Sequence, residues 1–175
     1  MRFLPPIVVV AALMLPVSCS GGAAEAAAPA TVEAAKAMLS DFMAADADRV
    51  ALSMALKPKP EDYGHVFSDA AMADKAAEAY EGLWGSIAEG PIGPKEGQTE
   101  ILVWHATTDE LKAGTGDSEQ FPGGYGDAAQ HLSAGLDVFR FKFVKPGETA
   151  GMAFDGLYNL DGRWVLMPKP WRIVD

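Results

Sequence analysis

Apolar residues in the first half of the chain recur every three or four positions, which is the spacing of one face of an α-helix. The pattern predicts helices over 32–43, 48–56 and 69–88, and a short helix is compatible with 61–67. Thr31 stands at the N-cap position of the first helix. The longest helix has the clearest apolar stripe, which consists of Met72, Ala76, Tyr80, Leu83 and Ile87.

The second half of the chain changes to the two-residue period of β-strands. Residues 99–107 are rich in β-branched and aromatic side chains, and residues 137–144 alternate strictly. In the second of these runs, Arg140 and Lys142 face away from a row of phenylalanines. We call this set the phenylalanine row: Phe139, Phe141 and Phe143.

Turn sequences divide the rest of the chain into a meander. "KPGE" at 145–148 and "DG" at 161–162 bound two returning strands, 149–160 and 163–167. Helices followed by antiparallel strands predict a single α+β domain over 31–175. In this domain the phenylalanine row is expected to pack on the apolar stripe of the long helix.

The N-terminus has the pattern of a secretory signal. Arg2 precedes an apolar run over 7–15, and small residues follow up to Cys19. Because the run is shorter than the roughly 20 residues of a membrane span, we assign 1–18 to a signal peptide and expect an exported chain. Cys19 stands where bacterial lipoproteins carry their lipidated cysteine, although Pro16 occupies the place that leucine usually has.

Two alternatives to lipidation remain for Cys19. A signal peptide cleaved within "GGAAEAAAPA" would discard it, and a buried structural thiol fits poorly with its small and polar flanks. With lipidation, residues 19–30 are the anchor cysteine and a flexible tether, because they lack large apolar side chains. Ser20 after the cysteine then favours the periplasmic face of the outer membrane. Without lipidation, the protein is expected to be periplasmic or secreted.

Composition limits the classes of partner. The chain has 14 Lys and Arg against 24 Asp and Glu, a net charge of −10, which argues against general binding to nucleic acid. A single cysteine allows no disulfide within the chain, so the fold must rest on its core. His65, His105 and His131 lie far apart without the spacing of metal ligands, so neither a metal nor another cofactor is expected.

The order of elements, ending in "DGRWVLMPKPWRIV", resembles the nuclear transport factor two-like (SnoaL-like, cystatin-like) cone fold. "AMLSDFMAADADRVALSMAL" is similar to the paired helices that open such domains, and "NLDGRWVL" to their last hairpin. The resemblance implies a curved, cone-like sheet around a long helix, with a pocket at its mouth. Members include isomerases, dehydratases and binding or accessory proteins, so the fold implies little about function. The chain departs from the pattern in a long Gly-rich loop and in "PKPW", which should end a central strand.

Candidate chemistry is sparse. No Gly-x-Ser-x-Gly elbow is present, so no nucleophilic triad is indicated. Alternation places His105 on one face with Ile101 and Val103, where it is either a core histidine or a general base lining the pocket. With Asp155 and Tyr158 of the meander, His105 completes the candidate acid/base site of an enzyme.

The Gly-rich loop 112–135 is long for a structureless connection. It carries two aromatic residues, Phe121 and Tyr125, which a mere linker does not need. One hypothesis makes them, together with His131, a flap that binds a small apolar ligand over the open end of the cone. The alternative is a packed Ω-loop with no ligand beneath it.

These features predict an exported, lipid-anchored protein of the cell envelope that acts as a small-ligand-binding or accessory module. Its expected partners are the membrane, through the lipid anchor, and a small apolar ligand or an envelope protein. The absence of a catalytic motif favours a non-enzymatic role. The alternatives are an isomerase- or dehydratase-type enzyme that uses His105, Asp155 and Tyr158, and a structural protein-interaction module.

We expect Cys19 to be diacylated after cleavage behind Ser18. Mass spectrometry of membrane-fraction protein should then find Cys19 at the mature N-terminus, with acyl chains attached. The Cys19→Ser substitution should move the protein into the soluble fraction. A soluble protein whose mature N-terminus lies downstream of Cys19 would contradict the hypothesis.

Overall fold

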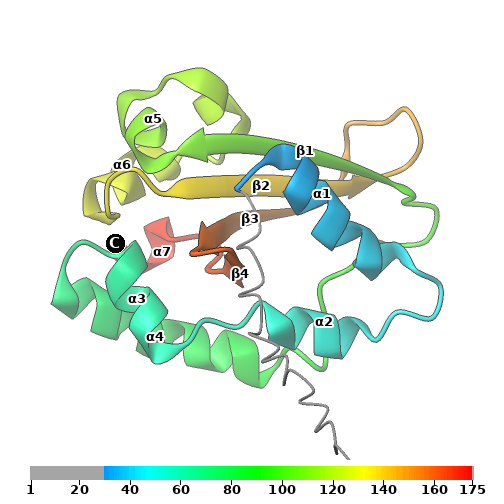
Figure 1. The fold of residues 1–175 in the computed structure, drawn as a ribbon, viewed down its shortest axis with the longest axis horizontal. Helices are drawn as coiled ribbons and strands as arrows, with labels where there is room; N and C mark the ends of the chain where they lie inside the picture. Colours follow the sequence, from blue (N-terminus) through cyan, green and yellow to red (C-terminus); the bar gives the residue numbers. More distant parts are fainter. Residues whose placement is uncertain (1–29, 175) are drawn as a thin grey trace, which may run out of the picture.

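The computed structural model describes residues 30–174. The predicted signal peptide, Cys19 and the tether up to residue 29 lie outside the described residues. Helices come first, and a curved, unclosed sheet of four antiparallel strands follows (Figure 1). The predicted single α+β domain is confirmed.

The helices of the first half begin at polar caps. They are α1 (Val32–Ser40), α2 (Arg49–Ala55), α3 (Pro60–Val66) and α4 (Ala70–Gly85), with a 3-10 turn, η1 (Asp41–Met43), directly after α1. Thr31 Oγ1 accepts a hydrogen bond from Ala34 N–H at 3.1 Å, and the carboxylates of Asp48 and Asp69 cap α2 and α4 in the same way. Such caps satisfy N–H groups that have no partner inside the helix. The predicted helices are confirmed, although α4 ends at Gly85 rather than at 88.

The strands pair with their neighbours in chain order. They are β1 (Glu100–Thr107), β2 (Asp137–Val144), β3 (Gly151–Leu160) and β4 (Arg163–Leu166). β4 ends just before Pro168 and Pro170, and proline has no N–H to donate to a ladder. The predicted termination of the strand at this sequence is confirmed.

The phenylalanine row is fully buried and belongs to the same core as Tyr80 and Ile87 of the α4 stripe. Phe141 and Phe143 contact Phe154 of β3, with ring centroids 5.0 and 6.1 Å apart. Leu83 of the α4 stripe is 38% exposed, and it faces Phe154 across a cavity instead of entering the core. The expected packing is therefore wrong at Leu83, which does not belong to this core.

The connection between β1 and β2 folds into short helices. They are α5 (Thr108–Ala113), η2 (Gly116–Gln120), α6 (Tyr125–Ala128) and η3 (Ala129–His131). Figure 1 shows α5 and α6 on the other side of the sheet from α2, α3 and α4. The Thr108 hydroxyl donates to the Ser133 carbonyl at 2.7 Å and accepts from Leu136 N–H at 3.1 Å, so both ends of the connection are held together.

A β-bulge interrupts β3 at Asp155 and Gly156, where the register with β2 shifts. Gly156 has φ +73°, and a Cβ at this position would lie 2.2 Å from the Met167 carbonyl oxygen. Beyond the bulge, β3 pairs with β4 only through Leu157–Leu160. Among the described residues, no strand therefore covers the outer edge of Gly151–Asp155.

Gly156→Ala should destabilise the domain more than Gly147→Ala. Both glycines have a left-handed backbone, but a Cβ at Gly147 meets no atom within 4 Å. We expect Gly147→Ala to lower the free energy of unfolding by about 1 kcal/mol, and Gly156→Ala by about 3 kcal/mol, since the clash adds to the strain. Denaturant unfolding of the two variants measures the difference. Equal losses would show that Met167 does not approach Gly156 closely.

Candidate functional site

Two adjoining cavities, of about 480 and about 430 Å³, lie between α4 and the uncovered part of β3. They share Leu83, Phe154 and Pro168 in their walls, so we treat them as one feature, the α4–β3 groove. Its remaining lining residues are Ala79, Tyr80, Ser86, Ile87, Glu89, Gly90, Ile92, Met152, Ala153, Asp155, Leu166, Lys169, Arg172 and Ile173.

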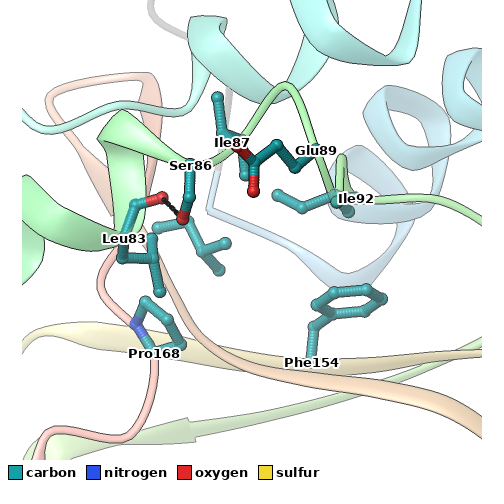
Figure 2. Close-up of a pocket in the computed structure, with 9 residues that line it drawn as sticks. Leu83, Ser86, Ile87, Glu89, Ile92, Phe154 and Pro168 are labelled. Atoms are coloured by element: carbon teal, nitrogen blue, oxygen red, sulfur yellow. Dashed lines mark hydrogen bonds between the residues drawn. The ribbon is translucent and has the colours of Figure 1, made fainter.

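The middle of the groove is apolar. Figure 2 shows Phe154 and Pro168 pointing from the sheet side toward Ile92 and Leu83, which belong to the opposite wall. That wall is fixed after α4 ends, because Ile92 N–H donates to the buried Ser53 Oγ of α2 at 2.9 Å. Leu83 is one of only a few large apolar side chains that stay exposed in the described residues. The groove therefore presents apolar surface that the fold leaves uncovered.

The two ends of the groove differ in charge. Lys169 and Arg172 are exposed at one end, and no described carboxylate forms an ion pair with either. Glu89 lines the other end. Lys169 has φ +56°, a conformation that non-glycine residues rarely adopt outside tight turns.

Asp155 lies beneath the cationic end and is 8% exposed. Its Oδ1 accepts hydrogen bonds from the Tyr125 hydroxyl at 3.1 Å and from Lys169 N–H at 2.8 Å. The Tyr80 hydroxyl donates to the Pro168 carbonyl at 2.9 Å. The carboxylate thus holds both the backbone of Lys169 and the Gly-rich connection.

Burial raises the pKa of three tyrosines near Asp155. It is the main cause for Tyr80, Tyr125 and Tyr158, and the negative charge of Asp155 adds to it in each case. The Tyr158 hydroxyl is buried without a hydrogen-bond partner in the described residues. These hydroxyls are therefore held neutral and are poor candidates for a base.

The structure does not bring His105, Asp155 and Tyr158 together. Tyr158 lies close enough to Asp155 for the carboxylate to raise its pKa. His105 pairs across the sheet with Phe139, whereas Tyr158 pairs with the adjacent Val138, so the two side chains point to opposite faces. The His105 imidazole lies 2.7 Å from Asp137 Oδ1 and contacts the Phe139 ring.

Phe121, Tyr125 and His131 do not line the α4–β3 groove. Phe121 and Tyr125 are buried and pack edge to face, and Tyr125 packs likewise on Trp171 of α7 (Trp171–Val174). The His131 carbonyl accepts a hydrogen bond from Ser68 N–H at 2.9 Å. This is the geometry of the packed Ω-loop alternative rather than of a flap over the groove.

Sequence reasoning missed the residues that give the groove its character. Helical spacing predicts Leu83 to be a core residue, and Phe154 carries no distinguishing signal in the sequence. Lys169 and Arg172 offer such a signal, since two basic residues stand close together in an acidic chain, beside prolines that end a strand.

The described residues contain no candidate metal centre, since no group of three or more His, Cys, Asp or Glu side chains is placed to hold an ion. No helix within 30–174 is both long and apolar enough to cross a membrane.

The buried tyrosines should make the domain sensitive to alkaline pH. An unfolded tyrosine has a pKa of about 10. Because the folded pKa values of Tyr80, Tyr125 and Tyr158 are raised, the unfolded state loses protons first, and stability falls as pH rises above about 10. We expect tyrosinate absorbance and loss of near-ultraviolet circular dichroism to develop together for these residues.

Tyr158→Phe removes one of these hydroxyls without removing a hydrogen bond, so this variant should lose less stability at alkaline pH. Ionisation of all the tyrosines near pH 10, in a domain that stays folded, would contradict the burial of this cluster.

Comparisons with protein-family models, with curated proteins and with solved structures found no match to this chain. The resemblance to the nuclear transport factor two-like cone stays a prediction that rests on the order of the elements. A functional assignment therefore depends on the α4–β3 groove and on its chemistry.

Proposed function

We propose that the domain is a small-ligand-binding module and that the α4–β3 groove is its binding site. The observation that carries this proposal is the groove itself, whose two cavities of about 480 and 430 Å³ share one apolar middle. Ligand sites are typically concave, mostly apolar and about 300–1,000 Å³ in volume, with a few polar groups at defined places. The α4–β3 groove fits this description.

The titratable groups favour binding over catalysis. Asp155 is largely buried, and its Oδ1 already accepts two hydrogen bonds. The groove lining does not include His105, which pairs with Asp137 on the other face from Tyr158. An acid/base pair open to the groove is therefore not assembled from the residues that the sequence suggested.

We also propose that the module is exported and tethered to the membrane by a lipid on Cys19. The support for this is the sequence of the first thirty residues, with its signal pattern, its single cysteine and its tether. A module tethered in this way would take its ligand from the cell envelope.

An uncharged fluorescent apolar probe, N-phenyl-1-naphthylamine, tests the proposed site. The Cys19→Ser protein is used because it carries no acyl chain that could compete. We expect saturable fluorescence enhancement, and Leu83→Arg should weaken probe binding at least tenfold, because a charge would project into the apolar middle.

Met54→Arg is the matched control, since Met54 is 41% exposed on α2 and does not line the groove. It should leave probe binding unchanged. Absence of saturable binding, or equal losses in both variants, would refute the groove as the site.

A further inference from the structure

We propose that the ligand of the α4–β3 groove is an amphiphile with a single anionic head group and an apolar tail. The head lies at Lys169 and Arg172, and the tail follows the groove past Leu83 and Phe154 toward Ile87. This inference rests on the proposed function, since it names the chemistry of the ligand that the groove takes.

The charged side chains at the two ends of the groove favour an anionic head group. The chain has a net charge of −10, yet Lys169 and Arg172 share one end of the groove, and neither has an ion-pair partner in the described residues. An anion at this end gains from both cations. Glu89 at the other end would repel the same head group, so the charges also fix the direction in which the amphiphile lies.

The backbone of Lys169 supports this assignment. Its φ is +56°, and it is one of two described non-glycine residues with positive φ; the other, Asp161, belongs to the hairpin turn before β4. Glycine adopts this conformation without strain, whereas lysine does not. The Lys169 N–H bond to Asp155 holds this strained backbone in place, so the lysine is fixed at this end of the groove.

The carboxylate of Asp155 does not reverse the preference of this end of the groove for an anionic head group. Its carboxylate lines the same cavity but is 8% exposed, and its Oδ1 accepts from Tyr125 and Lys169. Lys169 and Arg172 are exposed at the rim, so an arriving head group meets them first. One recessed carboxylate against two exposed cations leaves this end positive.

Apolar surface supplies the rest of the affinity. Leu83, Phe154 and Pro168 line both cavities, and Ile87 and Ile92 continue the apolar lining beyond them. Each methylene that a tail buries there should tighten binding about fourfold. Affinity should therefore rise with chain length until the tail fills the groove.

Isothermal titration of the Cys19→Ser protein with dodecanoate and with dodecylammonium, both below their micelle-forming concentrations, tests the charge preference. We expect dodecanoate to bind at least tenfold more tightly than dodecylammonium, and about fourfold more tightly than undecanoate. Lys169→Gly and Arg172→Gln should each weaken dodecanoate binding about fivefold, with no loss for the uncharged probe. Lys36→Gln, which removes an exposed cation of α1 outside the groove, should change nothing.

Lys169→Gly separates a binding role from a structural one, because glycine relieves the strain and keeps the N–H that bonds Asp155. The variant should be at least as stable as the parent while it binds dodecanoate more weakly. Unchanged dodecanoate affinity in this variant would overturn the proposal.

The remaining outcomes also decide the question. If the uncharged probe binds at Leu83 but dodecanoate and dodecylammonium bind equally, the anionic head is refuted and the proposed function stands. If none of the three binds, both proposals fail. Self-association through the free edge of β3, without dodecanoate binding, would assign the groove to a second copy and overturn the amphiphile.

Discussion

The α4–β3 groove depends on the point at which β4 stops pairing with β3. Met167 N–H donates to the Gly156 carbonyl at 2.8 Å, and the next residue, Pro168, has no N–H to donate. The following donor, Lys169 N–H, bonds Asp155 Oδ1 instead of the backbone of β3. The ladder ends there, and the edge of β3 from Met152 to Asp155 is left to line a cavity.

The β-bulge at Asp155 and Gly156 allows the pairing of β3 with β4 to end in this way without a steric clash. It also places the Asp155 carboxylate beside the end of the pairing. A side chain at Gly156 would collide with the Met167 carbonyl, so only glycine lets the two segments approach as they do. Beside Gly156, Asp155 accepts hydrogen bonds from Tyr125 of the Gly-rich connection and from Lys169 of the C-terminal segment. One carboxylate thus joins parts of the chain that are far apart in sequence and fixes where the cationic end of the groove lies.

Periodicity predicted the elements of this fold but not its groove. Helical spacing identified α1, α2 and α4, and strand composition and alternation identified β1 and β2. Turn sequences bounded β3 and β4, and the prolines of "PKPW" marked the end of β4. The bulge carries no such signal, and it shifts the phase of β3, so that Phe154 and Leu157 both pair with residues of the phenylalanine row. Simple alternation therefore could not place Asp155 and Tyr158. Nor could spacing show that Leu83 stays exposed while Tyr80 is buried, because spacing defines a helix face and not how far the opposing surface reaches.

An apolar groove in a folded domain is expected to close unless its walls are held apart, since uncovered apolar surface costs about 25 cal/mol per Å². In this domain a hydrogen bond holds each wall of the groove in place. Ile92 N–H bonds Ser53 Oγ at 2.9 Å, which ties the segment after α4 to α2, and the Tyr80 hydroxyl bonds the Pro168 carbonyl at 2.9 Å, which fixes the separation of α4 from the C-terminal segment. A movement that broke either hydrogen bond would leave polar groups unpaired in buried or part-buried surroundings, which costs about 1–3 kcal/mol each. The groove is therefore already present in the domain without a ligand, and under the proposed function a ligand would not have to open it.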